Sequence, residues 1–231
     1  MGVKGVQPVS LVDYPGHICS TVFFGGCNFR CPFCHNAGLV ERADTLPDEN
    51  LEDVLAFLTE RRHLVPAVCI TGGEPTLAPE LTGFIRRLKR AGLLVKLDTN
   101  GTRPEVLRAL LAERLLDYVA MDVKAPPDKY GLLTGRPVDL EAIHRSINLI
   151  RTAAPAYEFR TTVVPELLTE KDILDIGREL AGSDKYVLQP FRPAHPLIDP
   201  QLELAAPCPV SFLEKVAKEL RALIKTVEVR G

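Results

Sequence analysis

Residues 18–36 read ICSTVFFGGCNFRCPFCHN, and this stretch combines the two patterns on which the fold depends. Its first part, Ile18–Phe24, is a run of apolar, β-branched and aromatic residues of the kind that forms buried strands. Its second part holds three of the six cysteines, Cys27, Cys31 and Cys34, in a C-x3-C-x2-C spacing. A buried strand therefore leads directly into a loop with three thiols.

The alternation of strand and helix continues to the end of the chain. We expect six parallel strands, at Ile18–Phe24, Ala67–Thr71, Leu93–Asp98, Asp117–Val123, Tyr157–Val164 and Lys185–Phe191. Amphipathic helices separate them, and in the stretch 81–88, for example, apolar residues recur three and four positions apart. This pattern predicts one α/β domain over residues 1–231, built either as a doubly wound sheet or as an open barrel.

The composition excludes several classes of protein. The 231 residues include 28 Lys and Arg against 30 Asp and Glu, so the formal charge is −2, which argues against a nucleic-acid partner bound through a basic face. The apolar runs are too short to cross a membrane, and the first ten residues lack the apolar core of a secretory signal. We therefore expect a cytoplasmic protein, in which crowded thiols hold a metal or perform redox chemistry.

Three thiolates on one short loop can converge on a metal centre. A structural zinc site uses four protein ligands in a closed tetrahedron, and His35 is poorly placed as a fourth ligand because it directly follows Cys34. An iron–sulfur cluster is the better interpretation, since closely spaced cysteines are typical of cluster loops. If a four-iron cluster binds three cysteines, one iron has no protein ligand and is open to another molecule.

Unusual polar motifs follow three of the other predicted strands. They are Gly72-Gly73-Glu74-Pro75, Asp98-Thr99-Asn100-Gly101, and the pair Asp122 and Lys124. The carboxyl ends of parallel strands meet at one edge of the sheet, where α/β proteins bind their ligands. We therefore expect these motifs and the cysteines to surround one site, although each motif alone could be a turn or a strand end.

With the cysteine triplet, the aromatic residue before its third cysteine and the Gly-Gly-Glu-Pro motif, the chain resembles the radical S-adenosylmethionine (SAM) superfamily. The resemblance implies an open, partial (β/α)6 TIM-type barrel with parallel strands, in which Cys27, Cys31 and Cys34 ligate a [4Fe-4S] cluster. In that family the open iron holds the methionine end of SAM. One electron from the cluster cleaves SAM to a 5′-deoxyadenosyl radical, which abstracts hydrogen.

The resemblance also implies a set of residues that bind SAM. They are Gly72, Gly73, Glu74, Asp98, Asp122, Lys124, Phe33 and Arg160. Two glycines let backbone carbonyls approach the amino group of SAM, and Glu74 attracts an ammonium. Lys124 is expected to pair with the SAM carboxylate, whereas Arg160 either faces the ligand or caps the barrel. The family pattern further implies a monovalent cation held by oxygens of Asp98, Thr99 and Asp122.

Within the superfamily the chain most resembles the glycyl-radical-enzyme activases, and among them the activating proteins of anaerobic ribonucleoside-triphosphate reductase. This likeness rests on residues 6–16 (VQPVSLVDYPG), 34–37 (CHNA), 159–165 (FRTTVVP) and 188–192 (LQPFR). It implies that the radical removes a hydrogen atom from a backbone glycine of a partner glycyl radical enzyme. It also implies a reduced flavodoxin or ferredoxin as electron donor.

Two other functions stay open at this point. A radical SAM enzyme that acts on a small molecule would need polar anchors for its substrate, and the sequence identifies no such set. An electron-transfer or scaffold protein with a structural cluster would not need the Gly-Gly-Glu-Pro motif or the pair of Asp122 and Lys124.

The remaining cysteines and two histidines have less defined expectations. Cys19 and Cys69 lie in apolar strands and are expected to behave as small hydrophobic residues, so that only one cluster is predicted. Cys208 is expected to be a more exposed, unpaired thiol. His35 is expected to form a hydrogen bond near the cluster, and His195 lies in a proline-rich segment expected beside the mouth of the barrel.

Overall fold

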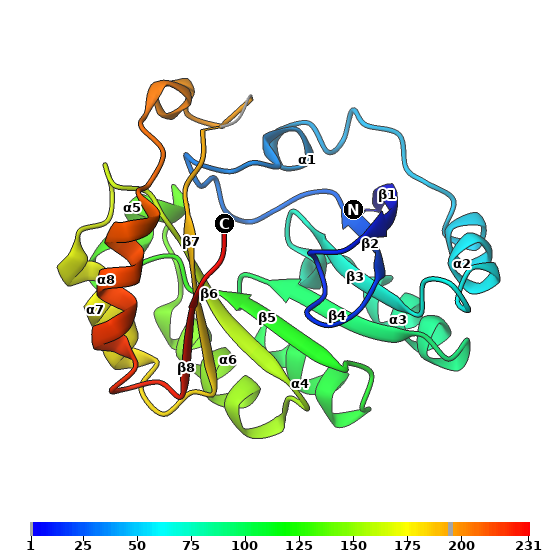
Figure 1. Ribbon diagram of the computed structural model, residues 1–231. Helices are drawn as coiled ribbons and strands as arrows, with labels where there is room; N and C mark the ends of the chain where they lie inside the picture. Colours follow the sequence, from blue (N-terminus) through cyan, green and yellow to red (C-terminus); the bar gives the residue numbers. More distant parts are fainter. Residues whose placement is uncertain (1, 194–195) are drawn as a thin grey trace.

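The computed structural model describes residues 2–193 and 196–231, and its centre is one curved sheet of eight strands (Figure 1). The strands are β1 (Val3–Ser10), β2 (Cys19–Phe24), β3 (Ala67–Gly72), β4 (Leu94–Thr99), β5 (Tyr118–Asp122), β6 (Tyr157–Val163), β7 (Lys185–Pro190) and β8 (Thr226–Val229). Their spatial order is their order along the chain, so within the described residues β1 and β8 are the edges of an open sheet. Strands β2–β8 run parallel, whereas β1 pairs antiparallel with β2.

Eight helices of the described residues lie around this sheet, most of them on its outer face, whereas α1 lies above the carboxyl ends of the strands (Figure 1). They are α1 (Ala37–Glu41), α2 (Leu51–Glu60), α3 (Leu81–Arg90), α4 (Pro104–Ala112), α5 (Tyr130–Thr134), α6 (Leu140–Ala153), α7 (Glu170–Glu179) and α8 (Val210–Leu220). In α3 the apolar residues of the predicted stripe are all buried, while Arg86 and Arg87 lie outside and pair with Glu113 and Glu52. In the described part of the chain, no helix has the length and apolar character needed to span a membrane.

The architecture confirms the predicted open α/β barrel and adds two strands to it. The six predicted strands correspond to β2–β7, with ends that differ by at most one residue. The sequence pattern does not predict β1 and β8, because each is an edge strand that is only partly buried. The apolar signal of β1 is further interrupted by Gly5 and Pro8, and β8 is only four residues long.

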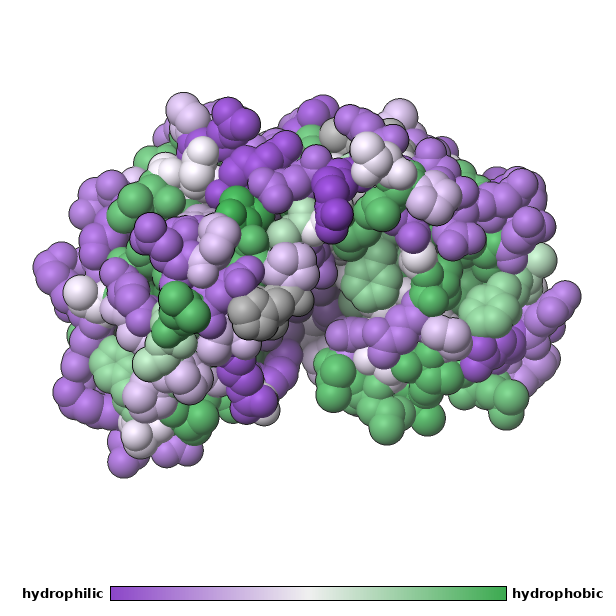
Figure 2. Space-filling model, turned by 90° about the horizontal axis from the view of Figure 1, so that it is seen from above, coloured by the Kyte–Doolittle hydropathy of each residue, from purple (hydrophilic) through white to green (hydrophobic). Residues whose placement is uncertain are grey.

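The two ends of the barrel differ in how they are filled. At the amino ends of the parallel strands, the loop between β1 and β2 places Tyr14 against Cys19, Cys69 and Tyr118 in a small buried cluster. The rings of Tyr14 and Tyr118 lie 5.8 Å apart. At the opposite end, seen from above in Figure 2, the molecule is notched between two lobes. Space for a ligand is therefore found at the carboxyl ends of the strands.

Candidate functional site

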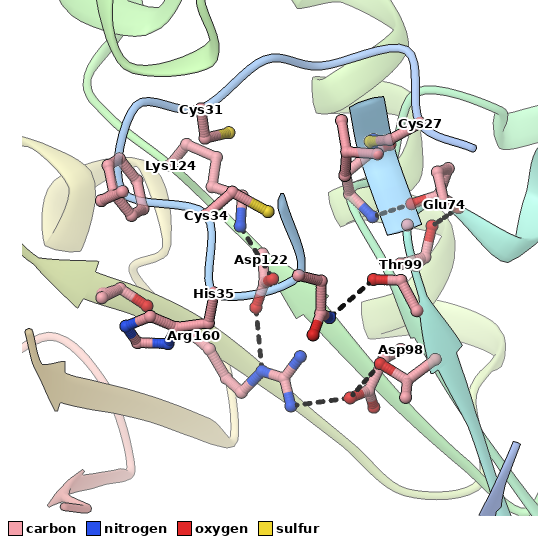
Figure 3. A pocket seen from close by; sticks show the side chains of 18 residues that line it. Cys27, Cys31, Cys34, His35, Glu74, Asp98, Thr99, Asp122, Lys124 and Arg160 are labelled. Carbon is pink, nitrogen blue, oxygen red and sulfur yellow. Dashed lines mark hydrogen bonds and ion pairs between the residues drawn. The ribbon is translucent and has the colours of Figure 1, made fainter. Parts of the chain in front are cut away.

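The loop between β2 and α1, residues 25–36, spreads the three cysteines over the carboxyl ends of the strands (Figure 3). We call this segment the cysteine loop. Cys27, Cys31 and Cys34 line one cavity of about 210 Å³, and Phe33 lines it as well. Most of the other lining residues come from the ends of β3, β4, β5 and β6, so the motifs expected at one edge of the sheet do lie together.

Hydrogen bonds fix the shape of the cysteine loop. The Arg30 side chain donates from Nη1 to the carbonyl oxygens of Cys27 and Phe29, at 2.7 and 2.8 Å. The backbone N–H of Arg30 donates to the Thr134 carbonyl at 2.7 Å, which ties the loop to α5. One arginine therefore supports the loop from within and anchors it to a neighbouring helix.

The three thiols are held in an environment that favours their protonated form. Burial raises the pKa of Cys27 to about 12 and that of Cys31 to about 11, and it also raises the pKa of Cys34. The positive charge of Lys124 opposes these shifts at all three positions. A bound metal reverses the balance, because a coordinating thiol loses its proton. These thiols therefore have the chemistry of metal ligands that are protonated when no metal is bound.

The arrangement of the thiols fits a cluster better than a single metal ion. Within residues 2–193 and 196–231, no three Cys, His, Asp or Glu side chains surround one point at which a single ion could bind. Tetrahedral zinc would require its sulfur ligands to meet about 2.3 Å from one atom. In an iron–sulfur cluster the thiolates bind different irons and stay apart. Three thiols that line one cavity have the donor chemistry of the second kind of centre.

The Gly-Gly-Glu-Pro turn packs directly against the start of the cysteine loop. The Gly73 N–H donates to the Phe24 carbonyl and the Glu74 N–H to the Gly26 carbonyl, each at 2.9 Å. A Cβ on Gly73 would lie 2.6 Å from the Gly26 carbonyl carbon and closer still to its oxygen. Gly72 has a φ of +124°, which side chains rarely allow. The glycines are therefore required for two loops to approach each other.

Glu74 ties this turn to the loop that follows β4. Its side chain is 1% exposed. One carboxylate oxygen accepts from the Thr76 N–H at 3.1 Å, from the Thr76 hydroxyl, and from the Thr99 hydroxyl at 2.8 Å, while the other accepts from the Asn100 N–H at 2.6 Å. Burial raises the pKa of Glu74, and these hydrogen bonds oppose the shift. The carboxylate thus positions neighbouring loops.

A chain of alternating charges forms the floor of the cavity (Figure 3). Arg160, from β6, donates to Asp98 at 3.1 Å and to Asp122 at 2.9 Å. Lys124 donates to Asp122 at 2.9 Å, and the buried Lys96 pairs with Asp98 from the inner side of the barrel. Burial alone would raise the pKa of both aspartates, but Arg160 and the lysines outweigh it and hold both pKa values below their usual range. Arg160 therefore faces the cavity.

Three asparagines join the loops of the site, although the sequence offers little sign of this role. Asn36 donates from Nδ2 to the Gly72 carbonyl at 2.9 Å. Asn100 donates to the side-chain oxygen of Asn28 at 2.8 Å. Asn28 and Asn36 lie within the cysteine loop and Asn100 lies in the motif after β4, so the signal for all three is that they belong to the motifs themselves.

The structure places the other three cysteines and His35 in different surroundings. Cys19 is buried among apolar groups, whereas the Cys69 thiol lies 3.8 Å from Asp98 in the charged floor. The prediction that Cys208 is exposed is wrong, because that residue is 4% exposed, with its N–H bonded to the Phe191 carbonyl. The bond of His35 is to the Arg192 carbonyl, at 3.0 Å. The expectation for His195 lies outside the described residues.

Comparisons with known proteins identify related chains. Residues 21–180 match the family model described as the radical SAM superfamily. A Methanocaldococcus jannaschii protein named "Putative glycyl-radical enzyme activating enzyme" is 38% identical over 83% of this chain and 80% of its own length. The pyruvate formate-lyase-activating enzyme of Clostridium pasteurianum is 26% identical over 82% of this chain and 81% of its own length.

A solved structure shares the fold. Streptococcus suis SuiB bound to S-adenosylmethionine aligns with a TM-score of 0.70 at 14% identity, over 91% of this chain. This chain spans only 52% of that protein, so the likeness concerns the fold alone.

Proposed function

This chain belongs to the radical SAM superfamily, and we propose that it activates a glycyl radical enzyme. Membership implies a [4Fe-4S] cluster and SAM, which together supply hydrogen-abstracting radical chemistry. The observation that supports a catalytic function most directly is the shared cavity. It brings three thiols, the Gly-Gly-Glu-Pro turn and the charged strand ends into contact with one space. A cluster with a purely structural role would not need the last two.

We assign the residues to roles by their position around the cavity. Cys27, Cys31 and Cys34 hold the cluster, and the apolar Phe33 beside them limits the access of water. The turn at residues 72–74 receives the amino group of SAM through backbone carbonyls, because its carboxylate is already engaged by neighbouring donors.

The charged floor serves the rest of the cofactor in this proposal. Lys124 lines the cavity and offers an ammonium to the SAM carboxylate. Asp98, Asp122 and Arg160 hold one another in fixed positions and complete the pocket. The pre-formed pairing means that binding SAM does not require these side chains to be ordered first.

The open side of the sheet favours a protein substrate. Strands β1 and β8 are separate edges, and the space-filling view shows a notch on the molecule (Figure 2). A backbone glycine can react only if a segment of the partner chain enters the site, and an opening at the side provides more room than a closed barrel. We propose anaerobic ribonucleoside-triphosphate reductase as the partner, with a reduced flavodoxin or ferredoxin as donor, on the resemblance of residues 6–16 and 34–37 to its activating proteins.

An anaerobic experiment tests both levels of this proposal. The protein is reconstituted with iron and sulfide, then reduced in the presence of SAM and a candidate reductase. We expect 5′-deoxyadenosine in the products and a glycyl radical in the EPR spectrum. A reductase variant whose radical glycine is replaced by Ala is the control and should give no such spectrum.

Two results would contradict the proposal at different levels. If reduced protein with an intact cluster produced no 5′-deoxyadenosine, radical SAM activity itself would be disproved. If SAM were cleaved and no glycyl radical formed on the reductase, that partner would be excluded. In the second case, cleavage accelerated by a small molecule would favour a small-molecule substrate instead.

A further inference from the structure

We propose that the guanidinium of Arg160 is the built-in cation of this site, so that the protein binds SAM without a monovalent metal ion. The proposal rests on the proposed function only in its reference to SAM. It differs from the expectation that Asp98, Thr99 and Asp122 supply oxygens to such an ion. In the structure those oxygens already have partners, and Figure 3 shows the bonds of Arg160 to Asp98 and to Asp122.

Arg160 lies between the two aspartates that the ion would need. Its Nη1 is 3.1 Å from Asp98 Oδ2, and its Nε is 2.9 Å from Asp122 Oδ1. The side chain of Arg160 is only 14% exposed. A planar guanidinium presents donors in a fixed fork, which suits a bridge between two carboxylates on adjacent strands.

The remaining oxygens also have donors. Lys96 pairs with Asp98 Oδ1, and Lys124 lies 2.9 Å from Asp122 Oδ2. The Thr99 hydroxyl donates to Glu74 at 2.8 Å and accepts from the Gly101 N–H at 3.1 Å. Every side-chain oxygen of the expected cation site therefore takes part in at least one hydrogen bond or ion pair.

The charge balance leads to the same conclusion. Lys96, Lys124 and Arg160 bring three positive charges to two carboxylates, so the cluster of five groups has a net charge of +1. A further cation would raise this to +2 in a largely buried place, where like charges repel strongly.

Two further carboxylates of the described residues, Glu158 and Glu74, lie near these five groups, and each is already surrounded by donors of its own. Glu158, deeper in the barrel, is matched by Arg230 at 2.8 and 2.9 Å and by Lys185 at 3.8 Å. Glu74 is turned toward Thr76, Thr99 and Asn100.

The first test measures cation binding directly, with thallium(I) as a probe for potassium. Thallium NMR of the full-length protein, titrated with a thallium(I) salt, should show no saturable site. A saturable thallium site that potassium displaces would overturn the proposal. This measurement needs neither SAM nor the cluster, so it decides the role of Arg160 even if the proposed function is wrong.

The second test measures the affinity for SAM. Equilibrium binding of SAM to the reconstituted protein is compared in potassium, sodium and tetramethylammonium chloride at one ionic strength. We expect dissociation constants that agree within twofold. A tenfold tighter affinity in potassium would contradict the proposal, whereas no binding of SAM in any salt would contradict the proposed function instead.

For an Arg160→Met variant we expect the opposite result, namely that a monovalent cation binds. Methionine keeps much of the apolar stem but removes the guanidinium, which leaves two lysines facing two aspartates with no net charge. Potassium would then restore the charge of the native cluster. We expect a saturable thallium site in this variant and at least tenfold tighter SAM binding in potassium than in tetramethylammonium.

A matched variant, Arg86→Met, removes a surface arginine that pairs with Glu113. It should behave as the unmodified protein does in both tests. If Arg160→Met gained no thallium site and no dependence on potassium, the view that the guanidinium fills a cation position would be refuted. Should this variant fail to fold, the thallium titration of the unmodified protein still gives a decisive result.

Discussion

Replacing Gly73 by alanine would force apart the two loops that build the site. Gly73 lies where the Gly-Gly-Glu-Pro turn crosses the backbone just before Cys27. The added Cβ would lie 2.6 Å from the carbonyl carbon of Gly26. Both sides of this contact are backbone, so no side-chain rotation relieves it and one of the loops must move.

The size of the effect follows from the contacts that such a movement disturbs. Overpacking costs about 1–3 kcal/mol, and the hydrogen bond of 2.9 Å from the Glu74 N–H to the Gly26 carbonyl contributes roughly 1 kcal/mol more. We therefore expect Gly73→Ala to lower the free energy of unfolding by about 2–4 kcal/mol. In a domain of this size each kcal/mol corresponds to roughly 2–4 °C, so the melting temperature should fall by about 5–15 °C.

The matched control is the same substitution at Gly83. This residue is exposed in the first turn of α3 (Leu81–Arg90), and nothing lies within 4 Å of the Cβ that alanine would add. Because alanine favours helix more than glycine does, Gly83→Ala should stabilise the protein by about 1 kcal/mol. Thermal unfolding followed by circular dichroism measures both variants. A melting temperature of Gly73→Ala equal to or above that of the unmodified protein would refute the close approach of the loops.

Other substitutions have equally definite expected outcomes. Cys31→Ala should abolish both bound iron and the cleavage of SAM, and cleavage that survived would contradict the ligand assignment. Arg230→Ala should lower the free energy of unfolding in urea by about 3 kcal/mol, because it removes the main partner of the fully buried Glu158 while Lys185 remains 3.8 Å away. Burial would raise the pKa of Glu158, but Arg230 lowers it below 4.5, so the pair stabilises the protein above that pH and loses its effect as the pH falls below it. The difference in free energy of unfolding between Arg230→Ala and the unmodified protein should shrink over that acidic range. A constant difference would argue against the pair of Glu158 and Arg230. Thr99→Val should cost about 1–3 kcal/mol in urea unfolding and weaken SAM binding, because a buried carboxylate oxygen loses one of its three donors, the hydroxyl at 2.8 Å; an unchanged affinity for SAM would limit Thr99 to a structural role.

The parts of the fold that could be predicted are those in which one local pattern determines the structure. Strands β2–β7 are buried on both faces, so each appears in the sequence as a continuous apolar run between turns. Edge strands bury less, and β1 and β8 therefore lack this signal. The same reasoning places the polar motifs at one end of the barrel, because parallel strands align their carboxyl ends.

The sequence predicts which residues form the site, but not which of these residues bond to one another. The cysteines and strand-end residues could be listed from their motifs, and the structure places them around one cavity. The bonds of Glu74 to Thr99 and of Arg160 to Asp98 could not, since they join residues 25 and 62 positions apart. Lys96 shows the difficulty most clearly: a charged residue in an apolar strand suggests solvent, yet it is 1% exposed inside the barrel.

The first and last residues that the structure describes, Gly2 and Gly231, lie near the carboxyl ends of the strands. The Gly2 carbonyl accepts from the Gly25 N–H at 3.0 Å, next to the start of the cysteine loop, and Gly231 lines a second cavity together with His35. A segment fused close to Gly2 or Gly231 would thus start near the entrance proposed for a partner chain. A purification tag or a fused domain could block access there. A linker that joins the activase to its partner at either of these ends would instead hold the partner close to the cavity.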